Sequence, residues 1–283
     1  MKLPFKIDLK DKVCVVTGGT GVLCGAMADA LAECGAKVAI LALGQEECDK
    51  KAKEINEAGG IAIGINTDVL SKDSLKKAHE IIFEKLGPVD ILINGAGGNH
   101  PKGTTTKEYF NMEDLDNKEL ITFFDLDYKG IEFVFNLNFL GTLLPCQEFS
   151  TDMLNKKGAT IINISSMNAY TPLTKIPAYS GAKAAVSNFT QWLAVHMSNV
   201  GIRVNAMAPG FFVTAQNQRL LFNEDGTPTA RTEKILNSTP MKRFGEADEL
   251  IGTLLFLACE EASSFVNGAV IPIDGAYSAY SGV

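Results

Sequence analysis

Short apolar runs alternate along the chain with longer segments in which apolar residues recur at helical spacing. The apolar runs are 12–16, 37–42, 61–65, 89–93, 160–164, 202–207 and 269–273, and such runs are typical of buried strands. Helical spacing covers 23–34, 45–58, 71–86, 132–155, a segment that begins near Tyr179, and 246–259. The alternation predicts an α/β fold: a doubly wound parallel sheet of about seven strands with helices on both faces.

Two segments interrupt this regular alternation. Residues 97–129 form a long, less regular excursion with room for one short helix. Residues 211–244 combine a polar loop with helical flanks, which makes them a candidate lid over a ligand. No linker, internal repeat or low-complexity tract divides the 283 residues, of which 46% are hydrophobic. We therefore expect one domain, residues 1–283, rather than two small ones.

The charge and cysteine content argue against several classes of function. The net charge of −7, the pI of about 5.1 and the lack of a basic run disfavour nucleic acid and anionic membrane as partners. Six cysteines form no CxxC pair and three histidines are scattered, so neither a metal site nor a disulfide framework is predicted. The sequence contains no apolar signal region and no run that approaches a membrane span. A reducing, cytoplasmic location fits best.

Three turns at strand ends predict a dinucleotide site. The sequence TGGTG, residues 17–21, follows the first strand and precedes a helix, so its backbone N–H groups and the helix dipole would face a pyrophosphate. Asp68 follows the third strand, and Asn94-Gly95-Ala96-Gly97 follows the fourth. All three turns lie at the carboxyl edge of one parallel sheet, where such folds bind ligands. The alternative is that the glycines only permit tight turns.

Ser166, Tyr179 and Lys183 form a candidate catalytic group at the same edge. Ser166 follows the strand 160–164, while Tyr179 and Lys183 are four residues apart and share one helix face. A free phenol titrates near ~10, and a nearby ammonium would lower that pKa enough for general acid–base catalysis. The serine hydroxyl could hold a substrate oxygen in line. By itself, however, the pattern more often marks a half-buried tyrosine, an exposed lysine and a serine at a strand end.

Taken together, these motifs resemble the short-chain dehydrogenase/reductase family over nearly the whole chain. Further matches are Asn138-Phe139-Leu140-Gly141, Pro209-Gly210 with Thr214, and Ile273-Asp274-Gly275. The resemblance implies a single-domain Rossmann-type fold and an enzyme that transfers a hydride between NAD or NADP and a carbonyl carbon, with no metal. It also implies a homotetramer, or at least a dimer, that packs through the helix carrying Tyr179.

The resemblance gives each catalytic residue a role and the cofactor a set of contacts. Tyr179 is the proton donor or acceptor, and Lys183 lowers its pKa and binds the nicotinamide ribose. Ser166 orients the reacting oxygen, and Asn138 helps to hold a water in the proton relay. The implied cofactor contacts are Gly18, Thr20, Gly21, Leu23, Leu43, Asp68, Val69, Asn94, Ala96, Gly97, Tyr179, Lys183, Pro209, Phe212 and Thr214.

The chain departs from the family pattern at several positions around the cofactor. Val22 and Cys24 stand where the family has glycines, and Gly95 stands where it has a second asparagine. The second strand ends in Ala42-Leu43-Gly44, with neither an acid for a ribose 2′-hydroxyl nor an arginine for a 2′-phosphate. The choice between NAD and NADP therefore stays open, although Glu46-Glu47 slightly favours NAD.

Several of these features occur together in one branch of the family. TGGTGVLCGAMA, NGAGGNHPK, PGFFVTAQN and the tail DGAYSAYSGV resemble sugar-acid reductases that interconvert D-fructuronate and D-mannonate. We expect His100, Asn168 and Arg219 to contact such a carboxylated polyol, although an ordinary loop histidine and a solvated arginine fit equally well. The alternatives are a gluconate 5-dehydrogenase or another polyol dehydrogenase, and, in a different class, a catalytically idle nucleotide sensor.

Overall fold

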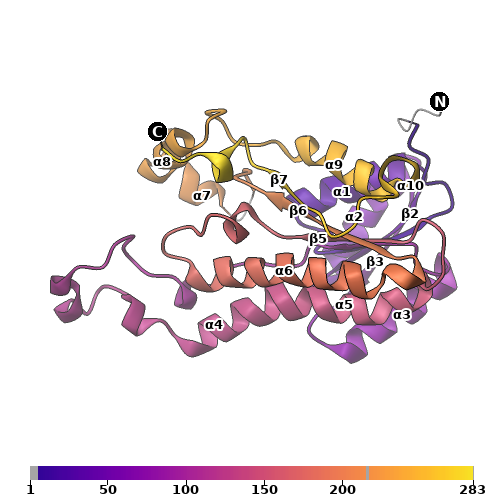
Figure 1. Cartoon of the computed structure of the whole chain (residues 1–283), viewed down its shortest axis with the longest axis horizontal. Helices are drawn as coiled ribbons and strands as arrows, with labels where there is room; N and C mark the ends of the chain where they lie inside the picture. The colour runs from indigo at the N-terminus through magenta and orange to yellow at the C-terminus, as the bar shows by residue number, and fades with distance from the viewer. Residues whose placement is uncertain (1–5, 215–216, 283) are drawn as a thin grey trace.

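One parallel sheet organises the computed structural model, which describes residues 6–214 and 217–282. The strands are β1 (Val13–Thr17), β2 (Lys37–Ala42), β3 (Ile61–Asn66), β4 (Ile91–Asn94), β5 (Thr160–Ile164), β6 (Arg203–Pro209) and β7 (Val270–Ile273). Within these residues they pair in the order β3-β2-β1-β4-β5-β6-β7, every pair parallel (Figure 1). The strand order reverses between β1 and β4, and this crevice is where doubly wound sheets bind ligands. The predicted fold class is confirmed.

Helices cover both faces of the sheet, as Figure 1 shows. One face carries α1 (Val22–Glu33), α2 (Gln45–Glu57), α9 (Ile251–Ala258) and α10 (Glu260–Ser263), and the other carries α3 (Lys72–Lys85), α5 (Gly141–Phe149) and α6 (Pro177–His196). The shorter helices α4 (Tyr128–Phe135), α7 (Gln218–Leu221) and α8 (Ala230–Ser238) lie beyond the carboxyl edge. The helix expected near Tyr179 begins at Pro177, because proline's fixed φ and missing N–H suit the first helical turn.

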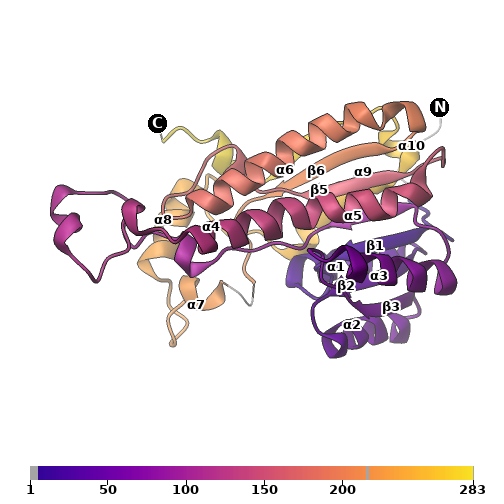
Figure 2. The same cartoon turned by 90° about the horizontal axis from the view of Figure 1, so that it is seen from below.

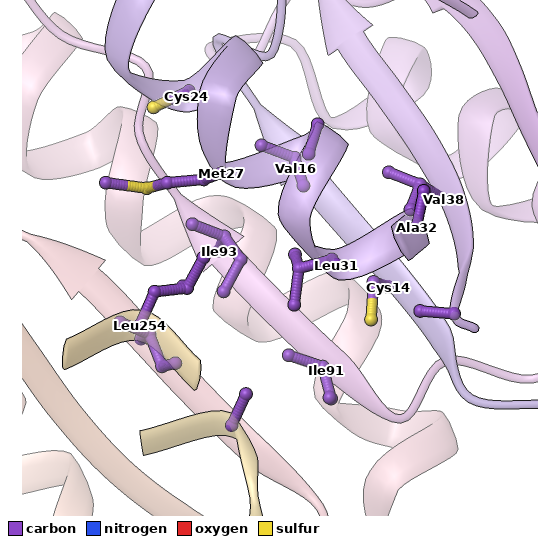
Figure 3. Close-up of a cluster of buried hydrophobic side chains, with 14 of the residues drawn as sticks. Cys14, Val16, Cys24, Met27, Leu31, Ala32, Val38, Ile91, Ile93 and Leu254 are labelled. Atoms are coloured by element: carbon purple, nitrogen blue, oxygen red, sulfur yellow. The ribbon is translucent and has the colours of Figure 1, made fainter. Parts of the chain in front are cut away.

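The strands are buried on both sides, which explains their continuous apolar sequences. On one face, Met27 and Leu31 of α1 pack with Val16 of β1, Ile93 of β4 and Leu254 of α9 (Figure 3). A second cluster, on the opposite face, joins β1, β4 and β5 to α3, α5 and α6 through Val15, Leu92, Ile161, Ile82, Phe149 and Leu193. The two clusters fix the sheet between its helical layers and hold its carboxyl edge in place.

The long helix expected over 132–155 is interrupted. It consists of α4, a π-helical turn at Asn136–Leu140, α5 and a closing 3₁₀ turn at Ser150–Met153. The π turn inserts extra backbone at Asn138 without disturbing the apolar period, and for that reason the sequence pattern reads as one helix. The helix expected over 246–259 likewise begins as a 3₁₀ turn, Ala247–Leu250, before α9.

The excursion between β4 and α4 forms an arm that projects from the body beyond α4 (Figures 1 and 2). It contains 3₁₀ turns at Pro101–Gly103, Met112–Asp116 and Phe123–Asp125 in place of the single short helix expected. A backbone hydrogen bond of 2.8 Å from Thr106 N to Ile121 O closes the neck of the arm. Close to this neck, Glu108 forms an ion pair of 2.8 Å with Lys234 of α8. No helix in the described ranges is long and apolar enough to span a membrane.

Candidate active site

The turn after β1 is built against the turn after β4. Gly18 has a φ of 67°, and a Cβ at this position would stand 3.0 Å from the backbone nitrogen of Ala96. The hydroxyl of Thr17 accepts hydrogen bonds from Gly95 N (3.0 Å) and Ala96 N (3.2 Å). Thr20 and Gly21 remain exposed at the N-terminus of α1. A glycine turn followed by the N-terminus of a helix fits a pyrophosphate.

The ends of β2 and β3 offer a surface of the kind that an adenosine requires. Leu43 is 72% exposed directly after β2, and Ala42 is paired with Asn66 at the end of β3. Asp68 is exposed, and its carboxylate accepts a hydrogen bond of 2.9 Å from Leu70 N. Val69 is buried against Gly141 of α5, which anchors this turn. The side chain of Leu43 and the carboxylate of Asp68 are therefore exposed to solvent beside the turn after β1.

Ser166, Tyr179 and Lys183 come together at the carboxyl end of β5. Ser166 directly follows the strand and caps a 3₁₀ turn, Met167–Ala169, by accepting a hydrogen bond of 3.2 Å from Asn168 N. Lys183, one turn after Tyr179 on α6, donates a hydrogen bond of 2.7 Å to Ile164 O and lies 5.7 Å from the centre of the Tyr179 ring. The end of β5 therefore positions the hydroxyl of Ser166 directly and the ammonium of Lys183 through the carbonyl of Ile164.

The electrostatics differ from the expectation that Lys183 lowers the pKa of Tyr179. Burial raises the pKa of Tyr179, and the opposing contribution comes from a hydrogen bond with Ser166. Burial also lowers the pKa of Lys183 to about 8, while the nearby Cys24 opposes that shift. Nζ of Lys183 points at a carbonyl oxygen rather than at the phenol oxygen, which is why it contributes little to the phenol. Lys183 is only 4% exposed, so water does not compensate its charge.

Asn138 connects the β4 turn to α4. Its amide donates to Gly98 O (2.7 Å) and Val134 O (2.8 Å), and its Oδ1 accepts from Gly98 N (3.2 Å). A Cβ on Gly97 would stand 2.7 Å from Asn138 Oδ1 and 3.2 Å from Lys183 Nζ. Only a glycine at 97 lets these two polar side chains approach the β4 turn so closely. The π turn aims Asn138 at this point.

The predicted contacts near the nicotinamide are brought together by two distant motifs. Gly210 N donates to Ile273 O (2.9 Å), so the segment Pro209-Gly210 lies against the end of β7. Phe212 is buried against Gly245, and Thr214 N donates to Asn217 Oδ1 (2.8 Å). The side chain of Asn94 is 1% exposed and donates to Asn163 Oδ1 (2.9 Å), so it joins β4 to β5 rather than facing the cleft.

The three candidate substrate residues have different surroundings. His100 accepts a hydrogen bond of 3.1 Å from Lys102 N, and its ring packs 5.2 Å from that of Phe133. Asn168 is 5% exposed, and its Oδ1 is buried without a partner in the described part of the chain. Arg219 is exposed on α7. Ala215 and Gln216, within the candidate lid, lie outside the described residues.

Sequence reasoning overlooked two residues that hold the site. Thr17 joins the β1 and β4 turns, and Gly98 binds Asn138 through both its N–H and its carbonyl. A threonine that ends a buried apolar strand is the available signal for Thr17, since such a hydroxyl needs a partner. Gly98 acts through its backbone alone and leaves no signal in the pattern. Across the described ranges, no group of three or more His, Cys, Asp or Glu side chains is placed to hold a metal ion.

Comparisons with known proteins agree with this geometry. Residues 12–225 match the short chain dehydrogenase family model. An uncharacterized oxidoreductase of Haemophilus influenzae is 59% identical over 283 residues, covering 100% of this chain and 99% of the relative. The uncharacterized oxidoreductase UxuB of Bacillus subtilis is 51% identical over 281 residues, covering 99% and 100%.

One similar solved structure holds a bound cofactor. It is a Haemophilus influenzae protein described as a "putative D-Mannonate oxidoreductase" with bound NAD, and it is 58% identical with a TM-score of 0.94 over 100% of both chains. The sheet order, the glycine turn and the serine, tyrosine and lysine at one sheet edge agree with the family match. The chain belongs to the short-chain dehydrogenase family and is an NAD(P)-dependent oxidoreductase.

Proposed function

We propose that this enzyme uses NADH to reduce the keto group of D-fructuronate to D-mannonate. The observation that carries the substrate assignment is the 58% identity, over the whole chain, to the NAD-bound protein described as a "putative D-Mannonate oxidoreductase". The chemistry is supported by the meeting of Ser166, Tyr179 and Lys183 at the end of β5. Bound NADH supplies the hydride that reduces the carbonyl carbon.

The side chains of the site handle the proton and the position of the substrate. Tyr179 donates its phenolic proton to the carbonyl oxygen that becomes the new hydroxyl. Ser166, already hydrogen-bonded to Tyr179, holds that oxygen in line. Lys183, whose ammonium is held by Ile164 O at 2.7 Å, binds the nicotinamide ribose. Asn138, which binds both backbone groups of Gly98, completes a path for the returning proton through water.

Three residues provide the contacts that a sugar acid needs. Because His100 Nδ1 accepts a hydrogen bond from Lys102, a neutral His100 ring carries its proton on Nε2 and can donate it to a substrate oxygen. The unpartnered Oδ1 of Asn168 is an acceptor for a polyol hydroxyl. Arg219 supplies the cation for the substrate carboxylate. Arg243 is less suited to bind the substrate carboxylate, because it already forms an ion pair of 2.6 Å with Glu249.

The remaining features of the proposal concern the whole chain. Residues 1–283 act as one domain, and 211–244 form a lid whose ends are joined, since Gly245 N donates to Phe211 O (2.9 Å). A homotetramer that packs through α6 accounts for the 57% exposure of Trp192 and the 76% exposure of Val195. The free cysteines of the described residues are compatible with the reducing cytoplasm.

A panel of keto acids tests the proposal. Oxidation of NADH would be followed with D-fructuronate, D-tagaturonate, 5-keto-D-gluconate and a simple ketone. Fast turnover of D-fructuronate alone, lost in Tyr179→Phe while NADH still binds, is the expected result. Preference for 5-keto-D-gluconate would make the enzyme a gluconate 5-dehydrogenase. Nucleotide binding without turnover of any substrate, unchanged in Tyr179→Phe, would favour a sensor.

A further inference from the structure

The end of β2 lacks the side chain that usually distinguishes the two nicotinamide cofactors. In dinucleotide folds, a carboxylate near this point accepts a hydrogen bond from the ribose 2′-hydroxyl of NAD, whereas an arginine accommodates the 2′-phosphate of NADP. Here β2 ends in Ala42 and continues with Leu43 and Gly44. None of these three can donate to a phosphate or accept from a ribose through a side chain. The discrimination must come from another element.

The carboxylate of Glu47 lies directly over Gly44. Gly44 precedes α2 with a φ of 93°, a conformation that side-chain-bearing residues rarely adopt. A Cβ at position 44 would collide with Oε2 of Glu47, and the three heavy atoms nearest to it all belong to that carboxylate. The bare Cα of Gly44 and its left-handed backbone thus make room for a carboxylate at the point where the β2 side chain is missing.

This carboxylate is not used to cap its helix. The N–H of Gly44 donates to Asn66 Oδ1 (3.1 Å) at the end of β3, so a different acceptor satisfies the helix N-terminus. Asn66 N in turn donates to Gln45 Oε1 (2.9 Å), which ties the β2 and β3 turns together. Glu47 is exposed, and no hydrogen bond or ion pair of its side chain is found among the described residues. Its oxygens are therefore free to bind a ligand.

The position of Glu47 matches the adenosine half of the cofactor. Gly19 N, in the pyrophosphate turn, donates to Leu41 O (3.3 Å), so the β1 turn borders the last residues of β2. Asp68 follows the neighbouring β3 on the other side. Gly44 lies between them at the shared carboxyl edge. Lys51, the α2 lysine closest to α1, is paired with Asp29 at 2.7 Å and cannot readily neutralise a 2′-phosphate.

We propose that Glu47 determines the preference for NAD over NADP by accepting the ribose 2′-hydroxyl and repelling a 2′-phosphate. This inference deepens the proposed function and rests on its use of NADH, but it is independent of the identity of the sugar acid. Glu46 shares the same helical turn and charge, yet it contributes none of the atoms over Gly44. Glu46 is therefore the matched control: general repulsion by an acidic turn would involve both residues, whereas ribose recognition involves Glu47 alone.

The test is direct titration of NADH and NADPH into wild type, Glu47→Gln and Glu46→Gln. Binding is read from nicotinamide fluorescence, so no substrate is required and failure of the sugar-acid assignment would not affect the result. We expect Glu47→Gln to lower the NADH-to-NADPH affinity ratio about tenfold or more and Glu46→Gln to change it less than about threefold. Added salt should narrow the wild-type ratio, chiefly by improving NADPH binding.

Two outcomes would overturn the assignment. Equal effects of the two substitutions would mean that the acidic turn acts only through its summed charge. An unchanged ratio in Glu47→Gln, with thermal unfolding also unchanged, would place the discrimination outside α2. Because Glu47 is exposed, neither substitution endangers folding, and a melting temperature near that of the wild type verifies this for each variant.

Discussion

The sulfur of Cys24, in the first turn of α1, occupies the space that a side chain at position 95 would need. Cys24 is 6% exposed and lies at the edge of the cluster beneath α1 (Figure 3). The two departures from the family pattern, a cysteine for a glycine at 24 and a glycine for an asparagine at 95, are therefore one exchange. The sulfur of Cys24 in α1 fills the space that the missing side chain of Gly95 leaves after β4.

This exchange predicts strong coupling between the two positions. Gly95→Ala should destabilise the protein by about 1–3 kcal/mol through overpacking, and Cys24→Ala in the same chain should recover part of that loss. Recovery is only partial because a Cβ at 95 also approaches Thr17 O at 2.9 Å. Urea unfolding of the two single variants and the double variant measures the coupling. Gly98→Ala is the control, since its new Cβ meets only Leu137 at 3.7 Å; additive effects at 24 and 95 would contradict the steric relationship.

Asn138 should matter more to turnover than to cofactor affinity. Asn138→Ala leaves both backbone groups of Gly98 without their partner, which costs about 2–4 kcal/mol of unfolding free energy if water does not replace it. Because Gly98 directly follows the turn that faces Lys183, we expect kcat to fall about 10-fold or more while the Kd for NADH changes less than about threefold. Steady-state kinetics measures the change in kcat, and titration with NADH measures the change in Kd. A parallel loss of both quantities would indicate a general collapse of the β4 turn.

Lys183 should destabilise the fold it serves. Burial lowers its pKa from 10.5 to about 8, so the unfolded chain binds its proton more tightly than the folded protein does. Burying the ammonium therefore lowers the unfolding free energy by its full amount below pH 8, and this destabilisation disappears as the pH rises from about 8 to 10.5. Lys183→Met should thus raise the unfolding free energy by about 1–2 kcal/mol at pH 7, after the bond to Ile164 O is lost, and abolish turnover.

Unfolding curves at pH 7 and pH 9.5 check this sign. The advantage of Lys183→Met over wild type should shrink at the higher pH. An advantage that grows with pH, or a variant less stable than wild type at pH 7, would show that the ammonium is well solvated or better paired than its 4% exposure indicates. The variant Tyr179→Phe serves as a control, because a phenol that titrates near ~10 is still mostly protonated at pH 9.5 and burial raises the pKa of Tyr179 further.

His79 should stabilise the protein most at low pH. Its ring binds Glu148 through Nδ1 and Asp152 through Nε2, both at 2.9 Å, and so joins α3 to the end of α5. Burial alone would lower the pKa of His79, but the two carboxylates outweigh it and raise that pKa. The stabilisation is therefore fully present below the unfolded value near 6.5 and is lost as the pH rises through the folded value.

The variant His79→Gln should lose about 1–2 kcal/mol more at pH 6 than at pH 9. Denaturant unfolding at both pH values gives the difference in unfolding free energy. Turnover at pH 7 should stay near that of the wild type, because His79 and its two carboxylates lie far from the end of β5. A loss of equal size at both pH values would mean that the histidine acts through packing against Phe149, whose ring centre is 5.3 Å away, and not through charge.

The sheet and the placement of Tyr179 and Lys183 on one helix could be predicted because each depends on local sequence. Buried parallel strands are continuous apolar runs, and Tyr179 and Lys183 share a helix face by spacing alone. The π turn at Asn138 could not be predicted, since it preserves the apolar period of the flanking helices. The exchange between Cys24 and Gly95 and the carboxylate over Gly44 both depend on space left by a missing Cβ. Such gaps appear only when distant segments are brought together.

The neck of the arm has a consequence for how the arm itself can change in this protein. Thr106 and Ile121 are hydrogen-bonded through their backbones, so residues 107–120 leave the body and return at the same place. A segment with adjoining ends can be lengthened, shortened or exchanged at a small cost in chain entropy, since the cost of closing a loop rises only slowly with its length. The strands and α6 stay fixed throughout. Evolution and protein engineering can therefore graft a different arm onto the same hydride-transfer machinery.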